Sequence, residues 1–335
     1  MQSRSLRQNY HQTMKAFSDY SALMEKAIRD MELPGGVLDT LYRPIEYALE
    51  SGGKRLRPSL LLMTADAFGN AADVAFSPAA GIEVFHNFTL LHDDVMDNSD
   101  MRRNRPSVFA KWGLNTAILS GDTMLTLATQ LMAEVSDSTL RPVLDAFNSM
   151  AIRVYEGQRL DMDFETSENV SLDDYLRMIM DKTGALIGCA AKIGALIGGA
   201  SEAEADKMYE YGMMLGVAFQ IQDDWLDVFG DSTTFGKPIG GDINNNKKSF
   251  LLLRGLETGG AEGDALREAM KMEAGPTKVK AVTRLYEKMN MSEICRAEIA
   301  SYSSKALAAL KSTSLDDERK APFRKLVDKL TGRKK

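Results

Sequence analysis

Apolar residues recur along most of this chain at intervals of three and four, the spacing of one face of a helix. One such segment runs from Ile82 to Leu90 and another from Leu215 to Leu226. There are no sustained alternating runs of β-branched residues, and Ala, Leu, Met, Glu and Lys dominate the sequence. The pattern therefore predicts an all-α fold.

Glycine and proline divide this helical pattern into segments. The expected helices cover residues 1–33, 38–51, 59–68, 78–97, 113–135, 140–165, a segment from 171 onward, a segment ending at 229, and most of 250–335 with breaks at 259–260 and 275–276. The chain has 335 residues and no linker rich in Pro, Gly or Ser, so we expect a single domain over residues 1–335. In that domain, residues 1–33 would form a helical cover or a dimer contact, and residues 260–335 the C-terminal helices.

Composition and charge exclude several classes of protein. The formal net charge is −6, which argues against nucleic acid as a partner. The longest apolar stretch, residues 185–200, is too short for a transmembrane segment and contains Lys192. Its small residues predict close helix packing instead. The first ten residues lack an apolar signal-peptide region, and the two cysteines, Cys189 and Cys295, do not form a disulfide framework. We therefore expect a soluble cytoplasmic protein.

Two acidic motifs of the same form, DDVMD and DDWLD, stand on helical segments. They place carboxylates at Asp93, Asp94, Asp97, Asp223, Asp224 and Asp227. The first and last aspartate of each motif share one helix face, because residues four apart are neighbours there. If the two helices face each other, the carboxylates converge and repel unless cations intervene. Mg²⁺ prefers oxygen ligands and bridges carboxylates to phosphates, so the pair predicts a diphosphate held by Mg²⁺. Two unrelated, solvated acidic helix faces are the alternative.

Basic residues flank the first acidic motif on both sides. Lys54, Arg55 and Arg57 follow Gly52-Gly53 and lie where a helix is expected to begin, and Arg102 closely follows DDVMD. Cations and backbone donors at a helix start bind anions well. A solvated basic loop is the alternative for the upstream group.

The order and spacing of these motifs, GGKRLRP, DDVMD with RR after it, and DDWLD, resemble those of the trans-isoprenyl diphosphate synthases, or polyprenyl synthetases. The resemblance runs from about residue 46 to about residue 253. It implies a helical bundle around a central cavity, a homodimer, Mg²⁺ as cofactor, and isopentenyl diphosphate and an allylic diphosphate as substrates. The family pattern has glycine where this chain has Asn104; because Asn tolerates left-handed backbone, we expect the turn to survive.

The resemblance also implies roles for individual residues. As metal ligands it implies Asp93, Asp97, Asp161, Asp223, Asp224 and Asp227. For ionisation of the allylic substrate it implies Asp93, Asp94, Asp97, Arg102, Lys182, Thr183, Gln220, Asp223 and Lys237. For substrate binding it implies Lys54, Arg57, His86, Arg103 and Lys247, with Phe88 in the cavity wall. Gln158 and Asp161 match a family pair on the cavity side, and Asp242 belongs with Lys237 and Lys247 to a late lysine–aspartate–lysine set. Arg333 in the basic C-terminus is a further candidate.

Together these residues predict a prenyltransferase that ionises the allylic diphosphate, joins it to isopentenyl diphosphate and then loses a proton. Phe88 and Thr89 occupy the fifth and fourth positions before Asp93. In the family an aromatic fifth position limits elongation and a second aromatic at the fourth favours farnesyl diphosphate. We therefore predict geranylgeranyl diphosphate as product, with farnesyl diphosphate the alternative. It also remains open that Phe88 only packs in the core and that Leu119 or Met124 sets the cavity floor.

Three other functions would use a similar helical chain. A terpene cyclase resembles the fold but lacks the GGKRLRP segment and the second DDxxD motif. A non-catalytic synthase subunit usually has degraded motifs, whereas both are intact here. A plain helical scaffold leaves the paired acidic motifs unexplained.

Overall fold

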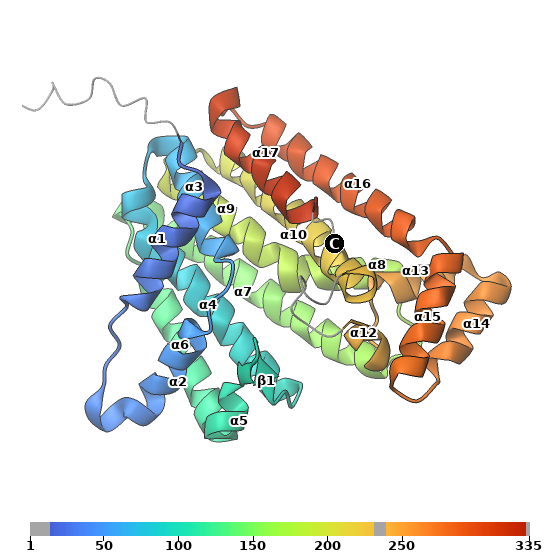
Figure 1. Cartoon of the computed structure of the whole chain (residues 1–335). Helices are drawn as coiled ribbons and strands as arrows, with labels where there is room; N and C mark the ends of the chain where they lie inside the picture. The colour runs from blue at the N-terminus through green and yellow to red at the C-terminus, as the bar shows by residue number, and fades with distance from the viewer. Residues whose placement is uncertain (1–13, 231–238, 333–335) are drawn as a thin grey trace, which may run out of the picture.

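The computed structural model describes residues 14–230 and 239–332, and these form a helical bundle (Figure 1). Its longer helices are α1 (Phe17–Arg29), α2 (Asp39–Glu50), α3 (Leu56–Gly69), α4 (Phe76–Met96), α6 (Leu114–Met132), α7 (Asp137–Thr166), α9 (Ala185–Ile197), α10 (Glu202–Phe229), α14 (Gly260–Met270), α15 (Pro276–Lys288), α16 (Met291–Lys311) and α17 (Asp317–Thr331). Its short helices are α5 (Val108–Trp112), α8 (Leu172–Ile179), α12 (Gly241–Asn244), α13 (Phe250–Thr258), the 3₁₀ turns η1 (Gly36–Leu38) and η2 (Ala72–Ala75), and the π-helical turn η3 (Met180–Gly184). The predicted all-α fold is confirmed.

The bundle is organised around α9 and α10, which pack against each other. Helix α3 covers α9, and α16 covers α10. Helix α4 packs against α6 and α3, while α7 packs against α9 and η3. In Figure 1, α2, α5 and α6 gather at one edge of the view and α16 and α17 at the other. This arrangement leaves α4 and α7 on either side of a central space.

The small residues of α9 allow the close helix packing that the sequence predicts. A Cβ atom added to Gly188 would stand 2.7 Å from the Tyr209 carbonyl oxygen, and one added to Gly212 would stand 2.7 Å from the Gly188 Cα. Both distances are shorter than carbon atoms tolerate, so the backbones of α9 and α10 touch because neither residue has a side chain. Nowhere in the described part of the chain is a helix both long and apolar enough to cross a membrane.

Several helix ends differ from the sequence expectation by a few residues. Helix α3 begins at Leu56 rather than 59, because Arg55 takes the left-handed conformation that precedes it (φ 45°). The expected loop at 69–78 contains η2 and the first turn of α4. The capping box predicted at Ser171 and Asp174 is present at the start of α8. The helix breaks expected at 259–260 and 275–276 separate α13, α14 and α15.

A two-residue hairpin follows α4, which the sequence analysis did not predict as strand. Strands β1 (Met101–Arg102) and β2 (Arg105–Pro106) pair antiparallel. The turn between them is formed by Arg103 and Asn104, which both have positive φ, 50° and 61°. Such a turn requires left-handed backbone at both central residues, and Asn104 adopts it as expected. The hairpin returns Arg102 and Arg103 toward the end of α4.

Candidate active site

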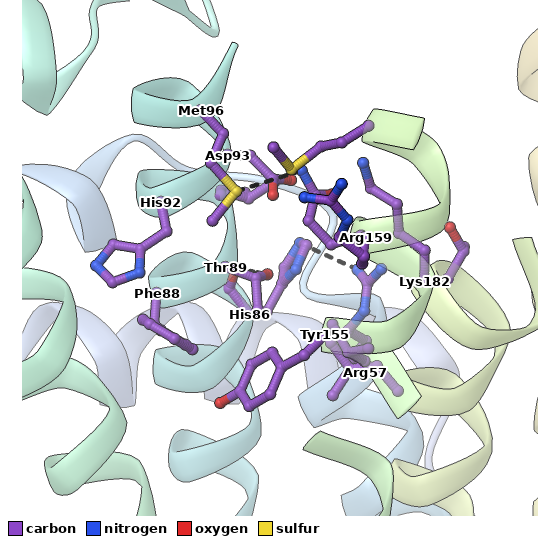
Figure 2. Close-up of a pocket in the computed structure, with 16 residues that line it drawn as sticks. Arg57, His86, Phe88, Thr89, His92, Asp93, Met96, Tyr155, Arg159 and Lys182 are labelled. Carbon is purple, nitrogen blue, oxygen red and sulfur yellow. Dashed lines mark hydrogen bonds between the residues drawn. The ribbon is translucent and has the colours of Figure 1, made fainter. Parts of the chain in front are cut away.

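A cavity of about 420 Å³ opens between α3, α4, α7, η3 and α9. Its wall consists of Arg57, His86, Phe88, Thr89, Leu90, His92, Asp93, Met96, Val154, Tyr155, Gln158, Arg159, Met162, Lys182, Thr183 and Leu186. Figure 2 shows Asp93 and Lys182 toward one end of this cavity and Tyr155 toward the other. The charged groups therefore gather at one end, which we call the mouth, and apolar side chains line the depth.

The aspartates of the first motif have different environments although they share α4. Asp93 lines the cavity, and burial raises the pKa of its carboxyl to about 6, although the nearby Lys182 ammonium opposes that shift. Asp97 is exposed at the helix end. Asp94 is buried and accepts two hydrogen bonds from Arg102, at 2.9 and 2.6 Å. Asp94 and Arg102, which the sequence analysis names separately, are thus joined in one ion pair.

In the second motif, Asp224 is held by partners within the protein. Its carboxylate accepts hydrogen bonds from the Tyr175 hydroxyl (2.6 Å), the Phe250 backbone N–H (2.9 Å) and the Gln220 side-chain amide (3.2 Å). Asp224 is 3% exposed. These contacts fix the start of α13 against α10, so they favour a structural role for Asp224 over the predicted role as metal ligand.

The other two aspartates of that motif lie nearer to charged groups of the site. Asp223 is half-buried, and its charge acts on the Arg57 guanidinium. Asp227 accepts a hydrogen bond from the Asp242 backbone N–H at 3.1 Å. Burial and the neighbouring Asp242 raise the pKa of Asp227 to about 6. Two carboxylates this close repel each other when both are charged, and a bound cation would relieve that repulsion.

Lysines connect the two acidic motifs. The Lys182 ammonium forms a 2.6 Å ion pair with Asp161 on α7. Burial lowers the pKa of Lys247, but the charges of Asp242, Asp161 and Asp224 outweigh burial and raise it. The charges of Asp97 in the first motif and Asp224 in the second therefore both act on the Lys247 ammonium.

The described carboxylates do not form a ready-made chelating cluster. Within residues 14–230 and 239–332, no three Asp, Glu, His or Cys side chains lie close enough to hold one metal ion between them. Mg²⁺ commonly binds through only one or two carboxylates and completes its shell with water and phosphate oxygens. Asp93 lines the cavity, whereas Asp223, on α10, is not among the side chains of its wall.

The basic residues of the GGKRLRP segment, residues 52–58, lie in different environments. Arg57 lines the cavity and donates a 3.1 Å hydrogen bond to Nε2 of His86. Burial lowers the pKa of Arg57 to about 10, and burial together with the Arg57 charge lowers the pKa of His86 well below its ordinary value. His86 is therefore neutral beside a guanidinium. Lys54 is exposed, with its ammonium 5.8 Å from the Phe219 ring centroid.

Arg55 does not belong to the anion site that its neighbours form. Its guanidinium is buried and pairs with Glu83 at 2.6 Å and Glu25 at 2.7 Å. It joins α1, α3 and α4, because these carboxylates come from two other helices. Arg103 donates to the Ser51 hydroxyl at 3.2 Å and lies near Gly53, so the hairpin brings a second arginine to the GGKRLRP segment.

The π-helical turn η3 presents Lys182 and Thr183 to the cavity. Thr183 donates a 3.2 Å hydrogen bond to Oε1 of Gln220, and the Gln220 amide donates in turn to Asp224. A Cβ atom added to Gly157 of α7 would stand 2.3 Å from the Lys182 backbone nitrogen. The absence of a side chain there lets η3 rest on α7. Single π turns in helices frequently mark functional sites.

Two aromatic side chains, Phe88 and Tyr155, line the cavity, and Tyr155 is 41% exposed. Phe88 packs edge-on against Tyr155, with ring centroids 6.2 Å apart and an interplanar angle of 89°. Neither Leu119 nor Met124, the alternative floor residues, is among the side chains that line this cavity: Leu119 is 58% exposed and Met124 is buried elsewhere. Sequence reasoning missed Tyr155, because its position relative to Phe88 depends on how α7 packs beside α4.

Two predicted residues, Lys237 and Arg333, lie outside the described part of the chain. The remaining predicted side chains come from α3, α4, the hairpin, α7, η3, α10 and the segment before α13. The predicted side chains that line the cavity are Arg57, His86, Phe88, Asp93, Gln158, Lys182 and Thr183, whereas those of the hairpin, α10 and the segment before α13 are not part of its wall.

Comparison with known proteins supports the same reading of the motifs. A family model described as polyprenyl synthetase matches residues 38–289. The chain belongs to the polyprenyl synthetase family. This polyprenyl synthetase is 39% identical to the geranylgeranyl diphosphate synthase of Methanosarcina mazei over 241 residues, 71% of this chain and 74% of that protein. It is 35% identical to a short chain isoprenyl diphosphate synthase of Methanothermobacter thermautotrophicus over 312 residues, 92% of this chain and 95% of that one.

Solved structures are similar over nearly the whole polyprenyl synthetase chain. A crystal structure of geranylgeranyl pyrophosphate synthase aligns with a TM-score of 0.90 and 39% identity, covering 96% of this chain and 100% of that one. A crystal structure of geranylgeranyl pyrophosphate synthetase from Pyrococcus horikoshii aligns with a TM-score of 0.87 and 30% identity. The family resemblance inferred from the motifs is confirmed.

Proposed function

We propose that this polyprenyl synthetase joins isopentenyl diphosphate to an allylic diphosphate and releases geranylgeranyl diphosphate. The observation that carries the proposal is the cavity itself. Its mouth holds Asp93, Lys182 and the Arg57–His86 pair, whereas its depth is lined by apolar side chains such as Leu186. The diphosphate head of a substrate would lie among the charged groups at the mouth, and its isoprenoid tail would lie against the apolar side chains in the depth. Relatives whose names specify geranylgeranyl diphosphate synthase favour the twenty-carbon product.

The charged groups divide between two diphosphates in this proposal. Asp93, Asp97, Asp223, Asp227 and Asp161 would hold Mg²⁺, which would supply positive charge to the allylic diphosphate as it leaves. Lys182, Lys237, Lys247 and Arg102 add fixed positive charge there. Arg57, neutral His86, Lys54 and Arg103 would bind isopentenyl diphosphate. Asp224 and Asp94 hold α13 and Arg102 in place.

The proposed reaction needs no separate catalytic base, because the released diphosphate can accept the proton. The allylic C1–O bond breaks with its electron pair passing to the diphosphate, and positive charge develops over three carbons of the tail. The double bond of isopentenyl diphosphate then donates its electron pair to C1, which leaves a cation on the tertiary carbon of the isopentenyl unit. The carbon of that unit next to the cation loses a proton to the released diphosphate, and the C–H electron pair forms the new double bond. The Thr183 oxygen faces the cavity where this charge develops.

We further propose a homodimer of single-domain chains. Helices α6 and α7 pack together and expose Leu114, Leu119 and Ile152 at 48%, 58% and 58%. Several large apolar side chains exposed on neighbouring helices are typical of an interaction surface.

We also propose a cytoplasmic location. The thiols of Cys189 and Cys295 are free and buried, which is compatible with a reducing compartment.

One assay tests the proposed reaction. Purified protein would be incubated with Mg²⁺, an allylic diphosphate and labelled isopentenyl diphosphate, and the dephosphorylated products separated by chromatography. We expect a twenty-carbon alcohol; a fifteen-carbon product would identify a farnesyl diphosphate synthase. Diphosphate release without isopentenyl diphosphate would indicate a cyclase, and no turnover a non-catalytic subunit.

A further inference from the structure

A buried oxygen atom in the cavity wall has no hydrogen-bond donor. Gln158 of α7 is 8% exposed and lines the cavity, and no donor in the described part of the chain reaches its Oε1 atom. A buried carbonyl oxygen without a donor destabilises the fold. Such an atom marks a place where water or a ligand can bind, and its surroundings indicate which ligand fits there.

The position of Gln158 along α7 places its amide between the apolar and charged parts of the cavity. Val154, one turn before it, lies in the apolar wall, and Asp161, nearly one turn after it, pairs with Lys182 at the mouth. At a rise of about 1.5 Å per residue, the Gln158 backbone lies about 6 Å from Val154 and about 4.5 Å from Asp161 along the axis. An allylic diphosphate with its head at Asp161 would place its reacting carbons beside Gln158.

The polar groups near this oxygen donate their hydrogen bonds elsewhere, so the oxygen can interact with a ligand. The Gln158 side-chain nitrogen points to the Met96 sulfur, 3.7 Å away, which turns the oxygen the other way. The Lys182 ammonium donates a hydrogen bond to the Asp161 carboxylate, and the Thr183 hydroxyl donates one to the Gln220 side chain. A diphosphate offers only acceptor oxygens and would be repelled by Oε1. A positively charged carbon centre would be attracted.

We propose that Gln158 is a further catalytic residue, whose Oε1 atom faces the positive charge that develops on the allylic carbons when the C1–O bond breaks. The charge meets Thr183 from η3 on one side and Gln158 from α7 on the other. This inference rests on the proposed function and adds a residue to it. The amide remains neutral, so it stabilises the cation without competing for the proton that is lost later.

Two ligands that differ only in charge test the assignment. One is an alkylammonium diphosphate with a cationic nitrogen in place of an allylic carbon, and the other is its uncharged carbon isostere. In Gln158→Leu we expect affinity for the ammonium compound to fall about tenfold or more, which is about 1.4 kcal/mol, while the isostere binds as before. Gln158→Glu restores an oxygen at the same place and should keep the preference for the charged compound.

Turnover and stability complete the test. In Gln158→Leu, kcat should fall by about ten- to a hundredfold with little change in KM for isopentenyl diphosphate, while the melting temperature stays equal or rises. Equal loss of affinity for both ligands, or a lowered melting temperature with normal preference between them, would overturn the assignment. If the wild type neither elongates the substrate nor binds either ligand, the proposed function fails instead.

Discussion

Asp93 on α4 and Asp223 on α10 are the first aspartates of their motifs. Replacing either by Asn keeps the shape but removes one negative charge. We expect turnover to fall by about a hundredfold or more, about 3 kcal/mol in the barrier. The matched control is Asp264→Asn, an exposed carboxylate on α14 that pairs with Arg267 and does not line the cavity, which should leave turnover unchanged. Normal turnover of both site variants at saturating Mg²⁺ would refute the metal role.

His86 makes the stability of the protein depend on pH. Burial and the Arg57 charge hold its pKa well below the ordinary value, whereas the unfolded chain has a histidine pKa of about 6.5. Below that pH the unfolded state binds a proton that the native state does not, so acidification destabilises the fold. Urea unfolding at pH 8 and pH 5 should show a greater loss of stability for the wild type than for His86→Gln. Parallel pH profiles for both proteins would contradict this.

Phe88 and Tyr155 pack against each other in the wall of the cavity. Phe88→Ala should allow products longer than those of the wild type, because it removes half of the aromatic barrier. It should also lower stability by about 3–5 kcal/mol, since Phe88 is buried. Chromatography of dephosphorylated products measures the first effect. An unchanged product length in a folded Phe88→Ala protein would mean that Tyr155 or another residue sets the limit.

At the scale of elements, the contact between α7 and η3 determines where Lys182 and Thr183 lie. A methyl group at Gly157 would collide with the backbone of Lys182 and Asp181, and backbone cannot move aside as a side chain can. Gly157→Ala should therefore lower stability by about 1–3 kcal/mol and reduce kcat. The matched control is Gly263→Ala in α14, where the nearest atom is 3.7 Å away; it should be neutral or slightly stabilising. Equal activity of the two variants would show that η3 tolerates displacement.

At the scale of the whole molecule, the apolar side chains exposed on α6 and α7 predict a dimer. Light scattering at micromolar concentration should give twice the chain mass of 36.9 kDa. Leu119→Asp places a charge among these side chains and should shift the mass toward the monomer, while the exposed control Asp264→Asn should not. A monomeric wild type would remove the support for the interface.

The sequence by itself determined the helical fold, the two acidic motifs and the family. Helical spacing is local, so the apolar positions before Asp93 and around Asp223 predict two amphipathic helices without knowledge of their neighbours. The left-handed turn at Asn104 was predictable for the same reason, because the backbone preference belongs to the residue.

Only the tertiary structure decided which of the motif residues line the cavity and which are held by partners inside the protein. Asp224 is held by Tyr175 and Phe250, and Arg55 by Glu25 and Glu83, partners that are from 26 to 49 residues away in the sequence. Tyr155 and Gln158 likewise join the site because α7 packs across from α4. Periodicity states which residues share a helix face. It does not state which neighbour that face meets, because packing between distant segments selects the partner of each buried charge.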